Sequence, residues 1–360
     1  MSKKVLLIGS QGYLGSRLTD YLQEWGYICS GIDTGFFKNG KLYEPNPVRT
    51  VRKDARSIKK SDIIGQDVVF LLAGISNDPF GNLTPDKIYN PTREYTIKIA
   101  TMCKELGVRF IFPSSCSVYG IGAGLSNEDS PTNPQTPYSI NKIQIEQDLA
   151  ILSDDSFSPI ALRLATVFGA SPRIRFDVVI NMLCGMALTN GKIVLNSNGQ
   201  AWRPHIYIDD VCHAFALCVD WEYQDGKLMI LNVGSTENNM QIIEVARLVQ
   251  SHFDGCELVF LNQVDGVDKS LHNLVNDKKI NDGVDKRTYK VLFDKIQSRL
   301  PNFDPVWNIN QGITQLVADL QKYRLDNSLF SKRDFYRLQQ LSHLHQNGDI
   351  NDDLYFAKMS

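Results

Sequence analysis

A serine, a tyrosine and a lysine occur in an order and at a spacing that would let their side chains transfer a proton together. Ser115 follows an apolar run at residues 110–112. Tyr138 and Lys142 lie four residues apart, directly after the candidate N-cap Thr136. This spacing places both side chains on one face of a helix. The ordinary pKa of a tyrosine hydroxyl is about 10, and a nearby ammonium group favours its deprotonated form. Ser115, Tyr138 and Lys142 are therefore candidate catalytic residues for general acid–base chemistry.

The elements around these residues decide whether the pattern is meaningful, because a Tyr-x-x-x-Lys pair arises by chance about once in a chain of this length. Residues 110–112 suit a buried parallel strand, and chemistry in open α/β sheets gathers at the carboxyl ends of such strands. Ser115 would stand at that end, and a helix beginning with Pro137 would carry Tyr138 and Lys142. The alternative is an exposed helix with an aromatic residue and a solvated lysine.

A glycine-rich turn near the N-terminus predicts a dinucleotide-binding site. An expected strand at residues 5–8 runs into three glycines spaced three apart, and an amphipathic run to residue 25 follows. Glycines let backbone N–H groups approach a pyrophosphate at a helix N-terminus, because no Cβ atom intervenes. A plain turn is the alternative. The candidate cofactor contacts in the turn are Gly9, Gly12, Tyr13, Leu14 and Gly15.

Asp33 is the acid that should meet the adenosine ribose. It lies 18 residues beyond Gly15, at the end of an expected strand at residues 27–32. Its charge would repel a 2′-phosphate, so NAD is favoured over NADP. Asp54, followed by Ala55, is a candidate contact to the adenine side of the cofactor, with a solvated loop acid as the alternative.

A further expected strand, at residues 67–72, ends in small residues. Leu72, Ala73 and Gly74 would let the nicotinamide half of the cofactor approach closely. The polar residues that follow would either face the substrate or form a simple turn. They are Ser76, Asn77 and Asp78.

Strands mostly alternate with helices, which predicts an α/β fold with a Rossmann-type, doubly wound parallel sheet. Residues 1–169 would form the NAD-binding domain, joined by parts of 204–234. Residues 170–320 would mainly form a smaller α/β substrate-binding lobe, and 321–360 a C-terminal helical extension for packing or oligomer contact. The other expected elements are strands at 48–51, 159–167, 192–195 and 229–233, and helices at 92–106, 139–151, 178–188, 209–219 and 239–251.

Charged residues of the second lobe could hold a diphosphate, because arginine presents a fork of donors that matches phosphate oxygens. Arg175, close to Asp177, and Arg203, among apolar and aromatic neighbours, are candidates early in the lobe. Arg287 could be a further phosphate ligand. Surface salt bridges are the alternative for these arginines.

Composition argues against several other classes of function. The chain has 360 residues, 43% of them hydrophobic, a net charge of −2, and no basic block of the kind that binds nucleic acid or a membrane surface. Its seven cysteines include no Cys-x-x-Cys pair, so neither a disulfide framework nor a metal site is expected. The first apolar run is too short for a signal peptide, and the run at residues 68–75 is too short for a membrane span. A cytoplasmic location is expected.

The chain resembles the extended short-chain dehydrogenase/reductases, specifically the NAD-dependent epimerase/dehydratase family acting on nucleotide sugars, over roughly residues 4–320. The resemblance implies NAD as cofactor and a nucleotide-diphosphate sugar as substrate. Residues 161–181 look most like members that build unusual sugars for bacterial surface polysaccharides. The expected helices at 92–106 and 139–151 could pair across the axis of a homodimer. The positions that match the family's motifs are Gly9, Gly12 and Gly15 for its glycine turn, Asp33 and Asp54 for its adenosine-side acids, Ser115, Tyr138 and Lys142 for its catalytic set, and Arg203 and Arg287 for its diphosphate arginines.

Three positions depart from branches of that family. The dehydratases carry an Asp-Glu pair directly after the catalytic hydroxyl residue, where this chain has Cys116 and Ser117, so the carboxylates for losing water are missing. Ser117 also replaces the epimerising cysteine of GDP-fucose synthase, and Cys116, one place away, is better interpreted as structural. Thr166 stands where relatives have a substrate-contacting Asn. Cys116, Ser117 and Thr166 are nevertheless kept as candidate substrate contacts.

The resemblance favours a nucleotide-sugar epimerase that acts at C4 by transient hydride transfer to bound NAD, with Tyr138 as the base. Ser115 would hydrogen-bond the reacting oxygen, and Lys142 would favour the phenolate and fix the nicotinamide ribose. A 4-ketoreductase or dehydrogenase with the same residues is the first alternative. A 4,6-dehydratase and a non-catalytic NAD-binding protein are the others.

Overall fold

Seven parallel strands form the central sheet, and the predicted Rossmann-type α/β fold is confirmed. The computed structural model describes residues 2–76, 85–260 and 287–357. The sheet has the order β11-β7-β5-β4-β1-β2-β3, and every neighbouring pair is parallel. The strand order reverses between β1 and β4, and such a reversal opens a crevice for ligands at the carboxyl ends of the strands. The strands are β1 Lys4–Ile8, β2 Ile28–Asp33, β3 Arg49–Arg52, β4 Val68–Leu71, β5 Arg109–Ser115, β7 Ile160–Leu164 and β11 Met229–Val233.

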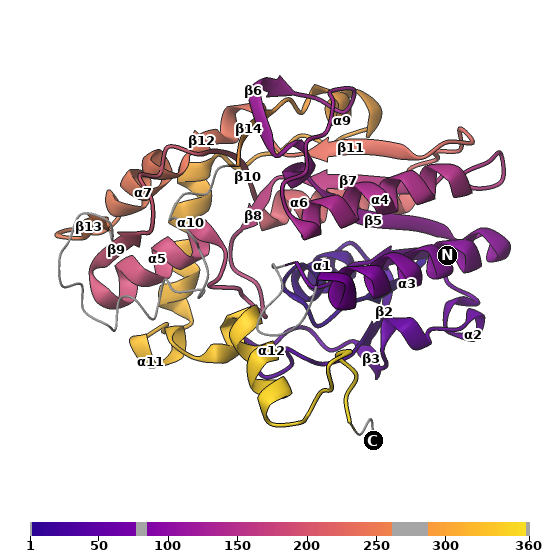
Figure 1. Cartoon of the computed structure of the whole chain (residues 1–360), viewed down its shortest axis with the longest axis horizontal. Coiled ribbons are helices and arrows are strands. Elements are labelled where there is room, and N and C mark those ends of the chain that lie inside the picture. The colour runs from indigo at the N-terminus through magenta and orange to yellow at the C-terminus, as the bar shows by residue number, and fades with distance from the viewer. Residues whose placement is uncertain (1, 77–84, 261–286, 358–360) are drawn as a thin grey trace.

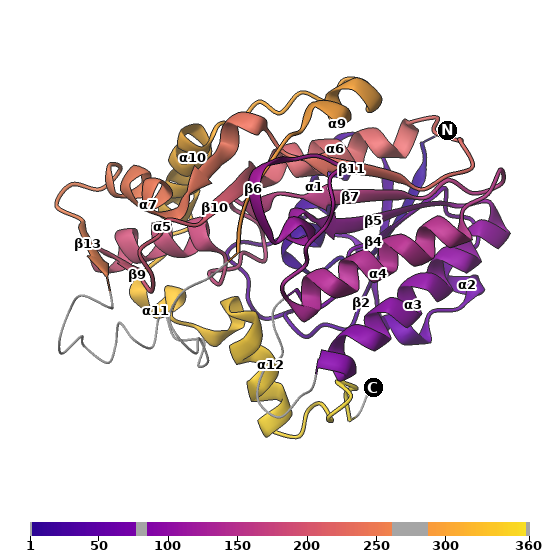
Figure 2. The ribbon, with the colours of Figure 1, turned by 45° about the horizontal axis from the view of Figure 1, so that its top comes forward.

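Helices cover both faces of this sheet, because successive strand residues point their apolar side chains to opposite faces. Val5 and Leu7 of β1 pack in one apolar cluster with α1 and α6, whereas Leu6 and Ile8 pack in another with α3 and α4. Figure 2 shows α3 and α4 side by side. The helices are α1 Tyr13–Glu24 and α6 Ile208–Asp220 on one face, and α2 Lys60–Ile63, α3 Pro85–Leu106 and α4 Pro137–Leu152 on the other.

A smaller α/β lobe lies beside the central sheet (Figure 1). Within the described residues, a three-stranded sheet has the order β12-β10-β8, and β13-β9 and β14-β6 form two-stranded sheets. The strands are β6 Ile121–Ser126, β8 Thr166–Phe168, β9 Lys192–Leu195, β10 Trp202–Tyr207, β12 Asn239–Gln241, β13 Glu257–Phe260 and β14 Thr288–Val291, and the helices are α5 Val179–Asn190, α7 Ile242–Gln250, α9 Asp294–Arg299 and α10 Ile309–Lys322. No helix of the described residues is both long and apolar enough to span a bilayer.

The C-terminal extension runs from the smaller lobe back to the edge of the central sheet (Figure 1). Its first helix, α11 (Asn327–Phe330), packs against α5. Beyond α12 (Arg337–Gln346), Ile350 and Leu354 share an apolar cluster with Ile88 of α3. The last described residues therefore lie near the crevice of the main sheet.

Three expected elements differ from those in the structure. α3 begins at Pro85 and not at residue 92. The helix continues through Pro91, although proline usually breaks a helix at an interior position. The strand expected at 159–167 is two strands, because the chain leaves the central sheet at Ala165 and β8 then pairs with β10. Residues 239–241 form β12 and not the start of a helix. The other expected elements agree with the structure to within three residues at each end.

Candidate active site

Two adjoining cavities lie at the carboxyl ends of the main strands. The larger has a volume of about 600 Å³ and the smaller about 130 Å³. They share a wall that comes mainly from the turns after β1 and β4. The residues that line both cavities are Gly9, Gly12, Phe37, Leu72, Ala73, Gly74, Ile75 and Thr92. Two joined chambers suit a ligand with two halves, such as a dinucleotide.

The glycine turn is shaped for close approach of a phosphate. Gly9 has a φ of +98°, and a Cβ atom there would lie 2.5 Å from the backbone nitrogen of Ala73. A Cβ atom on Gly15 would lie 2.1 Å from the carbonyl oxygen of Gly9, so glycine is required at both positions. α1 follows the N-cap Gly12, which has no side chain to occupy the first N–H groups. The turn therefore fits the diphosphate of NAD.

Asp33 places its carboxylate at the smaller cavity. One carboxylate oxygen accepts a hydrogen bond from the Gly35 N–H at 2.7 Å, and the other accepts one from the Gln11 N–H at 2.9 Å. Burial raises the pKa of Asp33, although these N–H groups and the charges of Arg173 and Arg337 lower it. The carboxylate is held in one orientation, as recognition of ribose hydroxyl groups requires.

Asp54 is buried, with 4% of its surface exposed, so the alternative of a solvated loop acid is wrong. Its carboxylate caps the 3-10 helix η1 (Ala55–Ser57) by accepting a hydrogen bond from the Arg56 N–H at 2.8 Å. The other carboxylate oxygen lies 2.6 Å from the Arg56 guanidinium. Asp54 and Ala55 both line the smaller cavity, as an adenine contact would.

Ser115, Tyr138 and Lys142 converge on the larger cavity. Ser115 ends β5, and its hydroxyl group accepts a hydrogen bond from the Ser117 N–H at 3.1 Å. Lys142 Nζ donates to the carbonyl oxygen of Pro113 at 2.6 Å and lies 5.5 Å from the centroid of the Tyr138 ring. One strand and one helix thus bring the three candidate catalytic residues together.

α4 begins where its sequence predicts. The Thr136 hydroxyl accepts a hydrogen bond from the Ser139 N–H at 3.2 Å, and the Ser139 hydroxyl accepts one from the Thr136 N–H at 3.0 Å. This reciprocal capping satisfies N–H groups at the helix start, and Pro137 suits the first helical position. The fixed first turn orients Tyr138 toward Ser115.

Burial shifts the pKa values of both titratable residues in this set. It raises the pKa of Tyr138, although the hydrogen bond with Ser115 and the charge of Arg175 lower it. It also lowers the pKa of Lys142 to about 7, while the Glu146 carboxylate raises it. Without a ligand, the Tyr138 hydroxyl is therefore protonated at neutral pH. A ligand that brings positive charge would favour its deprotonation.

The pKa of Lys142 predicts a pH-dependent stability in the cofactor-free protein. Because the folded pKa is about 7 and the ordinary value is 10.5, the folded state disfavours the charged lysine. The unfolded chain then binds more protons between these values, so stability due to Lys142 rises as pH increases from about 7 to about 10. Urea unfolding at both ends of this range should show that the stability of wild type increases with pH relative to that of Lys142→Met. A difference that stays constant with pH would contradict the shift.

The predicted substrate contacts around the 3-10 helix η2 (Cys116–Tyr119) separate into two groups. Ser117 lines the larger cavity, and its buried hydroxyl has no hydrogen-bond partner within the described part of the chain. Thr166 lines the same cavity. Cys116 is 1% exposed, and its thiol donates to the carbonyl oxygen of Arg163 at 3.2 Å. The structure therefore corrects the prediction that Cys116 contacts the substrate, because its thiol packs in the core.

Arg175 lies near the candidate catalytic residue Tyr138, with its guanidinium fixed on two sides. Its Nε and Nη2 atoms lie 2.7 and 3.1 Å from the carboxylate oxygens of Asp177, and Nη1 donates to the Ser76 hydroxyl at 2.6 Å. All three residues line the larger cavity. Asn77 and Asp78, the other polar residues predicted here, lie outside the described residues.

Arg203 and Arg287 form a different part of the wall of the larger cavity. The Arg203 guanidinium donates to the carbonyl oxygens of Arg287 and Trp202 and lies 5.0 Å from the centroid of the Tyr289 ring. Arg203 is only 8% exposed, so an ordinary surface salt bridge does not describe it. The two arginines remain candidates for binding a diphosphate.

Sequence reasoning missed the residues that the C-terminal extension brings to these cavities. Arg337 lines the larger cavity, and Asp353 and Leu354 line the smaller. No local spacing marks these residues. Phe36 and Phe37, which also line the smaller cavity, were missed too, although an aromatic pair just after Asp33 was an available signal.

Comparisons with known proteins agree with this geometry. A model of the NAD dependent epimerase/dehydratase family matches residues 5–234. The chain is 26% identical over 338 residues to a protein of Bacillus subtilis (strain 168) named as an uncharacterized UDP-glucose epimerase, and the match covers 88% of this chain and 98% of the relative.

Solved structures share the fold. One is TunA, an NAD-dependent NDP-hexosamine 5,6-dehydratase of tunicamycin biosynthesis, with a TM-score of 0.73 and 19% identity over 90% of this chain and 99% of that one. Another is UDP-glucuronic acid 4-epimerase from Bacillus cereus in complex with UDP-glucuronic acid and NAD, with a TM-score of 0.68 and 21% identity over 89% of this chain and 99% of that one. Because the family model matches more than half of its length, the chain belongs to the NAD-dependent epimerase/dehydratase family, whose enzymes use NAD as their cofactor.

Proposed function

We propose that this enzyme is a nucleotide-sugar epimerase that inverts C4 of its sugar. The observation that carries the proposal is the convergence of Ser115, Tyr138 and Lys142 on the cavity that the glycine turn also lines. The candidate acid–base residues therefore lie next to the expected binding site of the redox cofactor. The name of the Bacillus subtilis relative, a UDP-glucose epimerase, supports the same reaction class.

Each catalytic residue has a distinct task in this proposal. NAD, when bound, accepts the hydride that leaves the sugar carbon. Tyr138 takes the proton of the hydroxyl group on that carbon and later returns it. Ser115, which lines the same cavity as Tyr138, donates a hydrogen bond to the same sugar oxygen as it becomes a carbonyl. The charged form of Lys142 lowers the pKa of Tyr138 toward neutral pH, so that Tyr138 can act as a base.

Inversion requires the oxidised sugar to present its opposite face before it is reduced again. The larger cavity, at about 600 Å³, gives the sugar ring room to turn. The hydroxyl groups of Ser117 and Thr166 can hydrogen-bond the ring in either orientation, because each both donates and accepts. Arg203 and Arg287 would hold the diphosphate meanwhile, so that only the sugar moves.

The residues after Ser115 disfavour the dehydratase alternative. Loss of water needs an acid and a base, and a thiol and a hydroxyl occupy the two positions where dehydratases carry carboxylates. Burial raises the pKa of the Cys116 thiol, which makes it a poor base. The fold itself does not decide the matter, since TunA shares it and is a dehydratase.

One assay separates the candidate reactions. The purified enzyme is incubated with UDP-glucose, UDP-galactose or UDP-glucuronic acid while the reduced-nicotinamide absorbance is followed and the sugars are identified by NMR. We expect the C4 epimer to form with no net change in reduced nicotinamide. A stoichiometric change in that band would identify a ketoreductase or dehydrogenase, and a product lighter by one water would identify a dehydratase. Bound NAD with no conversion of any sugar would support a non-catalytic protein.

We also propose that the enzyme acts as a cytoplasmic homodimer in the synthesis of surface-polysaccharide sugars. α4 leaves Ile140 43% and Ile151 83% exposed. Two exposed isoleucines on one helix suit contact with a second copy of the chain. Light scattering of the purified protein measures the oligomeric state directly.

A further inference from the structure

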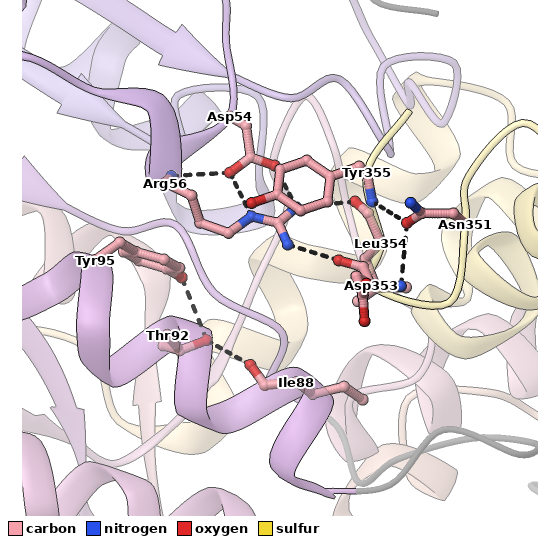
Figure 3. A network of polar contacts seen from close by, with 9 residues as sticks. All are labelled: Asp54, Arg56, Ile88, Thr92, Tyr95, Asn351, Asp353, Leu354 and Tyr355. Carbon is pink, nitrogen blue, oxygen red and sulfur yellow. Dashed lines mark hydrogen bonds and ion pairs between the residues drawn. The ribbon is translucent and has the colours of Figure 1, made fainter. Parts of the chain in front are cut away.

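The C-terminal extension reaches the cofactor site although it lies well beyond residue 234, where the match to the family model ends. α12 begins with Arg337, whose side chain lines the larger cavity. Asp353 and Leu354 line the smaller cavity, and Figure 3 shows both beside Arg56. One segment therefore contacts both chambers of the site.

Arg337 is a buried cation whose guanidinium has no hydrogen-bond acceptor in the described part of the chain. It is 7% exposed, and its guanidinium lies 3.8 Å from the centroid of the Phe37 ring. The guanidinium donates no hydrogen bond to any residue that the structure describes. Burial lowers the pKa of Arg337 to about 9, which reflects the penalty on its charge. A buried guanidinium that faces a cavity and has no acceptor points to an anionic ligand.

Among the described residues, charged side chains of both signs act on Arg337. Arg173, Arg175 and Arg337 are the cations of this group, and Asp33 and Asp177 are its carboxylates. Asp177 is already engaged by Arg175 through both oxygens. Asp33 accepts hydrogen bonds from two backbone N–H groups. An incoming phosphate would accept hydrogen bonds from the Arg337 guanidinium and bring a negative charge to it.

The position of Arg337 identifies the diphosphate of the dinucleotide as this anion. Its guanidinium lies 3.8 Å from the centroid of the Phe37 ring, and Phe37 lines both the cavity that contains Asp33 and the cavity that contains Tyr138. Arg337 therefore lies between the adenosine end and the catalytic end of the site. Gly12 and Gly15 line the same cavity as Arg337. Their turn, at the start of α1, offers backbone N–H groups to the same phosphate.

On the adenosine side, Arg56 ties the extension to the cavity wall (Figure 3). Its Nε donates to an Asp54 carboxylate oxygen at 2.8 Å, while Nη1 donates to the carbonyl oxygen of Asp353 at 2.6 Å and Nη2 to that of Leu354 at 3.2 Å. The ring of Tyr355 stacks on the same guanidinium, 3.3 Å from its centroid to Cζ. The backbone of the extension is thereby fixed as part of the wall of the smaller cavity.

We propose that the C-terminal extension completes the NAD site, with Arg337 binding the diphosphate and residues 353–355, held by Arg56, closing the adenosine side. The diphosphate of the nucleotide sugar has the same chemistry, so the experiment must separate the two ligands. This inference goes beyond the proposed function. It depends on NAD as the cofactor and is independent of the sugar and of the reaction.

The test measures binding to the full-length, cofactor-stripped protein by calorimetry. Arg337→Gln is expected to weaken NAD binding about tenfold to a hundredfold, because it removes charge-assisted hydrogen bonds to phosphate. Adenosine, which has no phosphate, and UDP, which belongs to the sugar-nucleotide side, should bind Arg337→Gln as they bind wild type. Arg333→Gln is the matched control, since the Arg333 side chain is exposed and bonds to Gln340.

Three outcomes would overturn the proposal. Unchanged NAD affinity would show that Arg337 does not bind the cofactor. An equal loss of adenosine affinity would mean that the side chain shapes the pocket without binding phosphate. A loss confined to UDP would assign the arginine to the nucleotide sugar.

A second variant tests the adenosine side without disturbing a buried residue. Tyr355 is 38% exposed, so Tyr355→Ala should leave the fold intact. It removes the ring that holds Arg56 and should speed the dissociation of NAD severalfold in stopped-flow measurements. Tyr355→Phe keeps the ring and should behave as wild type. If Tyr355→Ala releases NAD at the wild-type rate, the extension does not close the site, and this holds even if Arg337→Gln fails to fold.

Discussion

Replacing Tyr138 with Phe is expected to lower kcat by about a hundredfold to ten-thousandfold, the usual contribution of a positioned acid or base. The substitution removes only the phenolic oxygen, while the ring keeps its place in the cavity wall. Ser115 and Lys142 stay on β5 and α4, because neither element depends on that oxygen. The affinity for NAD should therefore remain close to that of wild type.

The matched control is the same chemical change at Tyr89. Its ring centroid lies 6.4 Å from that of Tyr138, it is 4% exposed, and its side chain does not line either cavity. Tyr89→Phe should turn over at nearly the wild-type rate. Single-turnover kinetics with bound NAD measure the chemical step directly. Comparable rates for Tyr138→Phe and Tyr89→Phe would rule out Tyr138 as the proton acceptor.

Local patterns in the sequence predict most of the fold and the cofactor turn. The strand at residues 5–8 is apolar throughout because both faces of the sheet are covered. Gly9 and Gly15 are glycines because a Cβ atom at either position would collide with backbone. The start of α4 is visible at Thr136 and Pro137, where capping depends on neighbours within three residues. Such features need only short stretches of chain and are therefore readable without a structure.

Contacts between distant segments explain what could not be predicted. Arg337 lies beside Phe37, about 300 residues away in the chain, and neither segment carries a pattern that points to the other. Cys116 and Ser117 are adjacent, yet one enters the core and the other the cavity, because the direction of each side chain is set by the turn of η2 after β5. The helix expected at residues 92–106 also begins too late, because α3 starts at Pro85 and continues through Pro91.

A buried ion pair close to the candidate catalytic residues gives the largest expected effect on stability. Glu146 and Arg163 have side chains only 4% and 5% exposed, with 2.6 Å between carboxylate and guanidinium. Glu146 also accepts a hydrogen bond from the Ser114 hydroxyl at 2.5 Å, and Arg163 donates one to the Tyr119 hydroxyl at 3.0 Å. The pair therefore joins α4, which carries Lys142, to β7, and the Ser114 hydrogen bond joins Glu146 to β5, the strand that ends in Ser115.

Glu146→Leu is expected to lower the free energy of unfolding by about 3–5 kcal/mol, because it leaves the Arg163 charge buried and unpaired. The double variant Glu146→Leu/Arg163→Met should recover most of this loss, since no isolated charge remains. Asp148→Leu is the control on the same helix. Its partner Arg93 is 41% exposed, so losing this pair should lower stability by only about 1 kcal/mol or less. Urea unfolding of the four proteins, including wild type, gives these differences. Two outcomes would contradict this explanation. Either Glu146→Leu and Asp148→Leu lose the same free energy of unfolding, or the double variant is no more stable than Glu146→Leu. In both cases the loss of stability in Glu146→Leu would not come from an unpaired buried charge.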